Sequence, residues 1–176
     1  MTVKITLTSL NTMPSDLQIA KEFVFDPCGF HFKNWKANLE SIEYAASSFE
    51  LDGKIIQFRV SKITPTKTGQ FVTIWKRTKE GITAPFESTD SLDFIIINSR
   101  SGDNFGQFIF PKSVLIEHGI ITNNGKEGKR GIRVYPPWDI ATNKQAVKTQ
   151  SWQLRYFLTI TKATSTDIAL AKHLLT

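Results

Sequence analysis

The sequence predicts a single α/β or α+β domain, with a mixed central β-sheet flanked by helices. Its 176 residues match one domain, and a chain of that size buries about 68–70% of its unfolded surface. A hydrophobic fraction of 40%, with thirteen Phe, is enough for a core. Helical patterns at both ends enclose strand patterns in the middle. We therefore expect one domain over 1–176, with a core over about 30–158 and a C-terminal helix over 166–175.

The N-terminal third has helical patterns. Ser15 with Gln18 forms a capping-box pattern that predicts a short helix through about Val24. A second helix is expected from Asn34 to about Ser47, because apolar residues there recur at helical spacing on one face. These residues are Trp35, Leu39, Ile42 and Ala46.

Strand patterns follow. Asp52-Gly53 separates two apolar segments, Phe49–Leu51 and Ile55–Phe58. Asp-Gly suits a two-residue hairpin turn, because both central residues of such a turn need positive φ. A further turn is expected over 65–69, followed by a strand from Gln70 to Arg77.

The centre of the chain predicts a second strand pair, and the C-terminal part a mixture of elements. Leu92–Asn98 and Phe105–Phe110 form the pair; within the first strand, Ile95–Ile97 is apolar without alternation, which predicts a strand covered on both faces. Four more elements are expected: a helix from Pro111 to His118 ended by Gly119, a strand over Ile132–Tyr135, a helix from the Thr142/Gln145 capping box to about Leu158, and a helix over Thr166–Leu175.

Positive charge is concentrated after residue 53. The formal net charge is +6, yet residues 1–53 hold four lysines against seven acidic residues. The segment 54–79 contains no acidic residue and seven basic ones: Lys54, Arg59, Lys62, Lys67, Lys76, Arg77 and Lys79. Such a balance fits an anionic partner, which is nucleic acid, a nucleotide or another phosphate-bearing ligand, and it fits a merely solvated face equally well.

Aromatic residues interleave with these cations. Trp75 and Phe71 lie within the acid-free segment, as on surfaces that stack bases and bind phosphates. For Phe71, packing in the core is the favoured interpretation. A second basic cluster, Lys126, Lys129, Arg130 and Arg133, lies in a glycine-containing loop over 122–131 that suits an anion cradle or, alternatively, a charged surface loop. It is not a Walker A loop, because Glu127 replaces the magnesium-binding Ser or Thr.

We therefore predict a positive track for nucleic acid or another anion. Its residues are Arg59, Lys62, Lys67, Trp75, Lys76, Arg77, Lys112, Lys126, Lys129 and Arg130. A phosphate backbone needs a continuous track, so the first cluster is expected on one face or edge of the sheet, with the 122–131 loop nearby.

The sequence gives little support for a disulfide, a zinc site, a serine-hydrolase or dinucleotide-binding motif, or a membrane segment. Cys28 is the sole cysteine, which excludes an internal disulfide and a cysteine-based zinc site. His31, His118 and His173 are scattered, and neither G-x-S-x-G nor G-x-G-x-x-G occurs. No signal-peptide or membrane-spanning pattern is present, so we expect a cytoplasmic protein without a membrane partner.

Four sequence blocks resemble the MepB family, small bacterial proteins named from an operon that encodes a multidrug efflux pump and its repressor. The blocks are EYAASSFELDG, FRVSKITPTKTGQFVTIWKR, FGQFIFPKSVLIEHGII and GKRGIRVYPPWD. They lie between Glu43 and Trp138, and the resemblance covers about Phe30 to Leu158.

The resemblance further implies the architecture of the PD-(D/E)XK nuclease-like superfamily. That architecture places Glu43 on a helix, Asp52 on a hairpin and Lys76 on a strand as catalytic residues, with Glu43 and Asp52 as magnesium ligands. Ile74 stands where the Glu-x-Lys pattern of this superfamily has an acid two residues before the lysine. Carboxylates are needed to hold magnesium at a phosphodiester, so this departure puts catalysis in doubt.

Three functions follow as alternatives. The first is a nucleic-acid-binding protein on a nuclease-like fold whose metal-dependent active site is absent or degenerate; it needs no cofactor. The second is an active phosphodiesterase that uses magnesium. The third is a pocket for a nucleotide, another small anion or a drug-like molecule, gated by the loop 122–131.

Overall fold

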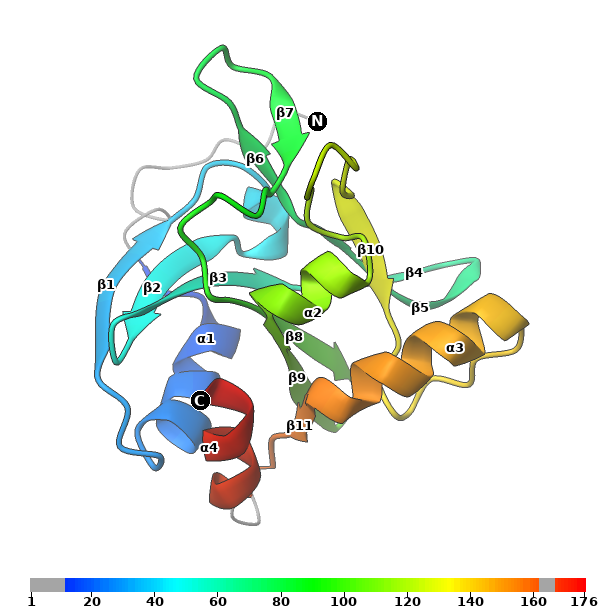
Figure 1. The fold of residues 1–176 in the computed structure, drawn as a ribbon. Helices are drawn as coiled ribbons and strands as arrows, with labels where there is room; N and C mark the ends of the chain where they lie inside the picture. The colour runs from blue at the N-terminus through cyan, green and yellow to red at the C-terminus, as the bar shows by residue number, and fades with distance from the viewer. Residues whose placement is uncertain (1–11, 162–166) are drawn as a thin grey trace, which may run out of the picture.

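The computed structural model describes residues 12–161 and 167–176. It is an α+β domain built on a mixed six-stranded sheet with the order β1-β2-β3-β8-β9-β11 (Figure 1). These strands are β1 (Phe32–Ala37), β2 (Ser47–Leu51), β3 (Lys54–Val60), β8 (Phe94–Ser101), β9 (Asn104–Pro111) and β11 (Phe157–Thr159). Only β3 and β8 run parallel among the pairs of this sheet; the others are antiparallel. The predicted mixed sheet is confirmed.

Two smaller sheets extend from this one. A three-stranded sheet, which we call the small sheet, has the order β10-β5-β4. Its strands are β10 (Gly131–Val134), β5 (Lys67–Thr73) and β4 (Lys62–Thr64). A two-stranded arm pairs β6 (Trp75–Arg77) with β7 (Thr83–Pro85) and projects from the body of the molecule (Figure 1).

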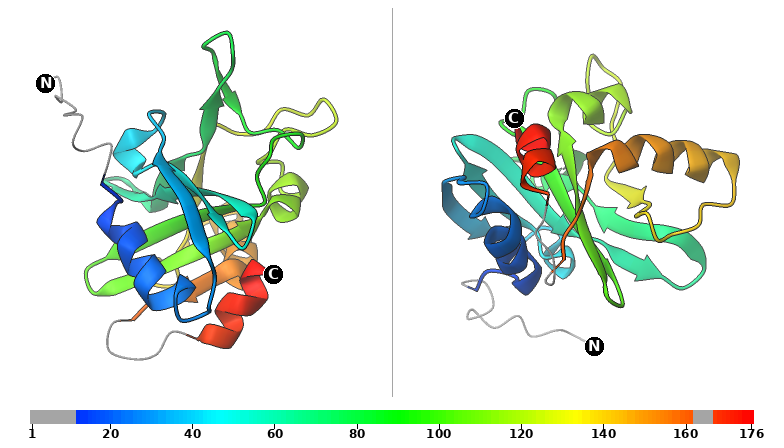
Figure 2. Two further views of the ribbon diagram at one scale, coloured as in Figure 1. Left: turned by 90° about the vertical axis from the view of Figure 1, so that its left-hand side faces the viewer. Right: turned by 90° about the horizontal axis from the view of Figure 1, so that it is seen from below.

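Helices and the small sheet cover the two faces of the large sheet. On one face lie α1 (Ser15–Ala20), the π-helical turn Lys21–Phe25 and α4 (Ile168–Leu175). On the other lie the small sheet, α2 (Lys112–Glu117) and α3 (Lys144–Gln153). Figure 2 shows α1 and α3 on opposite sides of β8 and β9. The domain thus has two hydrophobic cores, one on each face of the large sheet.

Strand β8 serves both cores, as its apolar sequence predicts. Ile96 packs with the core under α1 and α4, whereas Ile95 and Ile97 pack with the core under the small sheet. All three are at most 1% exposed. Successive side chains of a strand point to opposite faces, so a run without polar residues needs two covers.

Local turn chemistry agrees with the sequence at two places. Asp52 and Gly53 have φ values of 47° and 80° and join β2 to β3 as a tight hairpin. Helix α2 follows Pro111 directly, and its chain reverses at Gly119 with φ 66°. Both predictions are confirmed, because each depends on backbone preferences that a few residues determine alone.

The predicted helix over 34–47 is wrong. Residues Phe32–Ala37 form β1, which pairs with β2, and only Ile42–Tyr44 is helical, as a 3₁₀ turn. Leu39, assigned to the apolar helical face, is 67% exposed. Pairing with β2 gives the backbone its hydrogen bonds and stacks Phe32 on Phe49 at 4.6 Å between ring centroids, and this tertiary pairing outweighs helical spacing.

Three further boundaries differ from expectation. The strand expected over 70–77 is divided at Ile74, where β5 leaves the small sheet and β6 enters the arm. Helix α3 ends at Gln153 instead of Leu158, because Phe157 and Leu158 enter opposite cores from β11, which only an extended chain allows. Asn143, rather than Thr142, caps α3 by accepting from the Ala146 N–H.

The N-terminal and C-terminal helices also differ in detail. Ser15 makes no side-chain cap on α1; Gln18 donates to the Met13 carbonyl instead. The expected C-terminal helix is present as α4, capped by Asp167, whereas its predicted start at Thr166 lies outside the described residues. In the described part of the chain, no helix combines the length and apolar character needed to cross a membrane.

Gln153 joins α3 to the outer edge of the small sheet. Its side chain donates to the Arg133 carbonyl at 2.9 Å and accepts from the Tyr135 N–H at 2.8 Å. Gln153 is 1% exposed. The glutamine therefore replaces the strand that would otherwise pair with this edge of β10, and it fixes the position of α3 beside the small sheet.

Replacing Gln153 with Leu keeps the volume but leaves two buried backbone groups without partners. We expect destabilisation of about 1–3 kcal/mol for each such group, measured by urea unfolding. Gln145→Leu is the matched control, because Gln145 is exposed on the same helix, and it should change stability by less than about 0.5 kcal/mol. Equal effects of the two variants would contradict the role of Gln153.

Candidate anion-binding cleft

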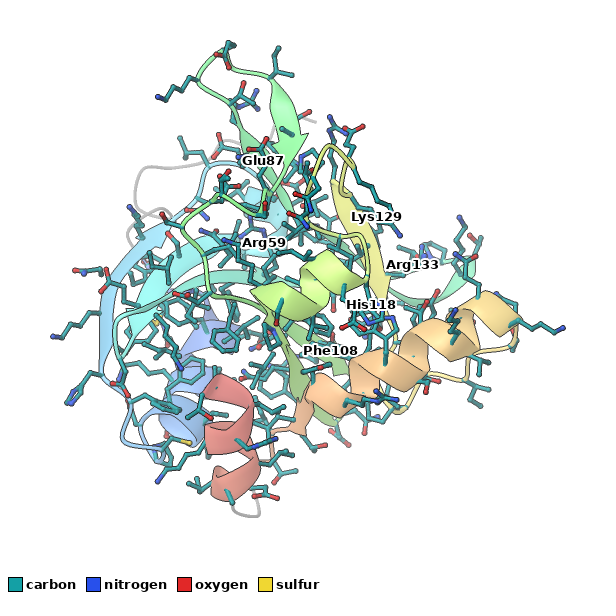
Figure 3. All side chains as sticks on the ribbon, in the orientation of Figure 1. Arg59, Glu87, Phe108, His118, Lys129 and Arg133 are labelled. Carbon is teal, nitrogen blue, oxygen red and sulfur yellow. The ribbon has the colours of Figure 1, made fainter. Side chains whose placement is uncertain are left out.

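A cleft of about 860 Å³ lies between the small sheet and α3. Lys67 and Phe71 of β5 and Arg133 of β10 line one side, and Lys148 and Trp152 of α3 line the other. The lining also includes Lys129, at the end of the loop over 122–131, and His118, at the end of α2. Figure 3 shows Lys129 and Arg133 along β10 and His118 beside α3.

The sheet side of the cleft is set by strand register. Phe71 on the central strand lies opposite Lys62 of β4 and opposite Arg133 of β10. Residues directly opposite in antiparallel strands share a face, so a cation flanks this ring on each side. The alternate residues Val72 and Ile132 point to the core instead. The cationic row is thus a direct consequence of the strand alternation that builds the core.

Four cations line the cleft: Lys67, Lys129, Arg133 and Lys148. Among the described residues that line it, none carries a carboxylate, and none of these four cations is in an ion pair with another described residue. Arg133 is held instead by neutral groups, the Gly69 carbonyl at 3.2 Å and the Thr64 hydroxyl at 2.9 Å. The cleft is therefore a region of uncompensated positive charge.

Aromatic rings lie among these cations. The Phe71 ring is 6.0 Å from the Arg133 guanidinium and 6.1 Å from the Tyr44 ring. It belongs to neither core cluster of buried residues, so the favoured sequence interpretation of Phe71 as a core residue is wrong. Trp152 lies across the cleft, where His118 stacks on its indole with ring centroids 3.9 Å apart and planes within 9°.

Glycine shapes the sheet side of the cleft. A Cβ at Gly131 would lie 2.7 Å from the Phe71 Cζ, and one at Gly69 would lie 2.7 Å from the Tyr135 ring. Gly69 also has φ 80°, which L side chains rarely adopt. Each ring therefore packs closely against a glycine of a neighbouring strand, at a position where a larger residue would displace it.

Arg59 does not face this cleft or the solvent. It is 2% exposed, and it donates to the Phe58 carbonyl at 2.8 Å and the Thr73 carbonyl at 3.2 Å. Burial lowers the pKa of its guanidinium to about 10, and the Glu40 carboxylate opposes that shift. Arg59 thus links β3 of the large sheet to β5 of the small sheet, so its predicted place on a surface track is incorrect.

The predicted residues of the arm form a separate, neutralised group. Lys76 pairs with Asp90 at 2.7 Å and lies 3.6 Å from Glu87, whereas Arg77 pairs with Glu40 at 3.3 Å. Trp75 is on the same arm, with its ring 5.5 Å from the Arg77 guanidinium. Lys112, the first residue of α2, donates to the Asp90 carbonyl at 2.6 Å. None of these residues lines the cleft.

The basic residues of the loop over 122–131 also fall into two groups, one that lines the cleft and one that does not. Lys129 lines the cleft, whereas Arg130 pairs with Glu127 at 2.9 Å and donates to the Thr83 carbonyl. Lys126 is exposed and Lys62 lies 4.6 Å over the Tyr44 ring. Lys67 and Lys129 are therefore the two predicted residues that the cleft brings together, with Lys62 on the same sheet face.

Sequence reasoning missed Lys148 and Trp152. Both lie on α3 at a spacing of four residues, which places them on one helix face. That spacing was visible in the sequence, but only the position of α3 beside the small sheet shows that this helix face lines the cleft. Arg133 was recognised in the second basic cluster without being placed on the predicted track.

The three residues implied as catalytic do not converge. Glu43 is exposed before β2, and Asp52 lies in the turn after it, where its carboxylate accepts from the His31 N–H at 2.8 Å. β2 alone has five residues and so spans about 16 Å. Lys76 is bonded to Asp90 instead. Within residues 12–161 and 167–176, no group of three or more His, Cys, Asp or Glu side chains is placed to hold a metal, so these residues do not fit a magnesium site.

Comparison with known proteins gives the family. The family model described as MepB-like matches residues 38–159. The chain belongs to the MepB-like family. A crystal structure of MepB is 35% identical, covers 73% of this chain and 86% of its own, and superposes with a TM-score of 0.71. The resemblance deduced from the four sequence blocks is confirmed.

A bacterial homing endonuclease is also similar, at a much lower level. It is 14% identical, covers 78% of this MepB-like chain and 88% of its own, and has a TM-score of 0.40. No match was found among curated proteins.

Replacing Arg59 tests whether it serves the fold or a ligand. Arg59→Ala removes both donors and leaves a cavity between the sheets, so we expect a loss of about 3 kcal/mol or more in the free energy of unfolding. Lys62→Ala, on an exposed neighbouring strand, should cost less than about 0.5 kcal/mol. Thermal unfolding of both variants provides the comparison. An Arg59→Ala protein of unchanged stability would show that the residue does not hold the sheets together.

Proposed function

We propose that this MepB-like protein binds nucleic acid in the cleft between the small sheet and α3. The observation that supports this most directly is the set of four cations, Lys67, Lys129, Arg133 and Lys148, which face one cleft without a carboxylate beside them. A phosphate backbone offers the regular negative charge that such a set attracts. The half-buried rings of Phe71 and Trp152 among them suit bases that stack.

The form of the cleft indicates binding that is independent of base sequence. Lys and Arg contacts to phosphates fix the position of a nucleic acid but read no bases. The cations of the cleft come from two strands, a loop and a helix, and α3 is set against the small sheet through Gln153. We therefore expect affinity to depend mainly on charge and stacking.

We further propose that the protein binds without cleaving. Under this proposal a nuclease-like ancestor has lost its metal-dependent site, because Glu43, Asp52 and Lys76 lie apart and Ile74 is buried in the core. Incubation with oligonucleotides and magnesium should leave them intact. Cleavage that Asp52→Ala abolishes would overturn this part and restore the phosphodiesterase alternative. A nucleic-acid partner also agrees with the cytoplasmic location expected from the sequence.

A small anion is the second candidate. The cleft volume of about 860 Å³ lies within the range of small-molecule pockets, about 300–1,000 Å³. A nucleotide would fill part of it and contact Lys129 at the end of the loop over 122–131. A thermal-shift series separates the two: stabilisation by mononucleotides equal to that by oligonucleotides would favour the small-anion pocket.

Neutralising two lysines of the cleft tests its role in binding. We expect Lys67→Gln/Lys129→Gln to weaken binding to single-stranded oligonucleotides of any sequence. The slope of log affinity against log salt should become shallower by about 0.7 for each phosphate that the protein no longer neutralises. Fluorescence anisotropy titrations at several salt concentrations measure both quantities.

The matched control is Lys33→Gln/Lys36→Gln, which removes the same charge from exposed positions on β1, at the far edge of the large sheet. This control should keep the affinity and slope of the native chain. If the two double variants behave alike, net charge rather than the cleft governs binding. Failure of the native chain to bind at low salt would refute the proposed function.

A further inference from the structure

A second hollow adjoins the cleft on α3. Its volume is about 640 Å³, and its lining includes Lys144, Lys148 and Arg155. The two hollows share five lining residues: His118, Thr142, Asn143, Lys148 and Trp152. They are therefore neighbouring parts of one surface, and the His118–Trp152 pair lies where they meet.

The His118–Trp152 pair is a rigid stack. The rings are 3.9 Å apart and nearly parallel, and the Trp152 ring is also 5.3 Å from the fully buried Phe110. His118 is the C-terminal cap of α2, just before the chain reversal at Gly119. A stack held by a core residue at one end and a helix terminus at the other keeps its orientation without a ligand.

Positive charge continues on both sides of this stack. Lys129 and Arg133 lie in the first hollow, Lys144 and Arg155 in the second, and Lys148 in both. Glu117 is the one acidic residue among the described lining of the two hollows. A mononucleotide carries its phosphate at one end and would use only one of the hollows. A chain of nucleotides brings repeated phosphates and bases, and this alternation matches cations on either side of flat rings.

We propose that the His118–Trp152 stack is a base-stacking platform, and that the ligand is a single-stranded nucleic acid that runs from the cleft across this platform into the second hollow. This inference rests on the proposed function and specifies its ligand class. Unpaired bases expose their faces for stacking on side chains, whereas the interior bases of a duplex are already stacked on each other. Single strands are therefore preferred over duplexes of the same length.

The first test replaces His118. His118→Ala removes the platform ring and should weaken binding of single-stranded oligothymidylate by about five- to a hundred-fold, the effect of removing one stacked ring. The salt slope should stay unchanged, because every phosphate keeps its cation. His118→Phe keeps a flat ring and should restore most of the affinity, and His173→Ala, on α4, is the control for removal of a histidine elsewhere. Duplex binding should change little in all three.

The second test concerns ligand length and does not depend on the folding of a His118 variant. Arg155→Gln removes an exposed cation that lies only in the second hollow. Against oligothymidylates from the dinucleotide to the dodecanucleotide, it should weaken binding of the long members and leave the shortest unaffected. Lys67→Gln, which acts in the first hollow, should weaken all lengths.

The outcomes separate this inference from the proposed function. Native protein that fails to bind any oligonucleotide at low salt refutes both. Binding that is as tight in His118→Ala as in the native chain, or that Arg155→Gln reduces equally at all lengths, overturns the platform and leaves the cleft as the binding site. A shallower salt slope in His118→Ala would show that His118 contacts a phosphate as a cation, which also overturns the stacking role.

Discussion

The central strands β8 and β9 of the large sheet carry apolar side chains on both faces, and the rest of the domain follows from covering them. Within β8, Ile96 is buried in one core, and Ile95 and Ile97 are buried in the other. Burying apolar area contributes about 25 cal/mol per Å², so neither face of these central strands is left to solvent. α1 and α4 cover one face, whereas the small sheet, α2 and α3 cover the other (Figure 1). The cleft lies between two parts of this second cover, where the small sheet and α3 turn their polar sides to each other.

The distribution of ion pairs then decides where positive charge remains available. Cations of the arm are neutralised by Asp90 and Glu40, and Arg59 is engaged in joining the two sheets. Lys67, Lys129 and Lys148 meet no carboxylate among the described residues. The basic segment 54–79 is therefore not one functional surface. It contains a structural arginine, a paired arm and one strand that contributes to the cleft.

Features that depend on a few neighbouring residues were predictable from the sequence. The Asp52-Gly53 hairpin, the two-sided burial of β8 and the Gly119 chain reversal are of this kind. Features that depend on distant pairing were not. Residues 34–37 form an edge strand only because β2 is beside them, and Leu158 leaves the helical pattern because β9 offers an edge. The site follows the same division, since Lys148 and Trp152 reach Lys67 only where α3 lies against β10, a position that Gln153 helps to fix.

The four tryptophans provide the most direct measurement of where nucleic acid binds. Each indole N–H gives one resonance in a ¹H–¹⁵N spectrum, and the rings occupy different regions: Trp152 in the cleft, Trp75 on the arm, and Trp35 and Trp138 with buried N–H groups. During titration with single-stranded oligothymidylate, we expect a progressive shift of the Trp152 resonance while that of Trp75 stays in place. A shift of Trp75 with Trp152 unchanged would place the interface on the arm and contradict binding in the cleft.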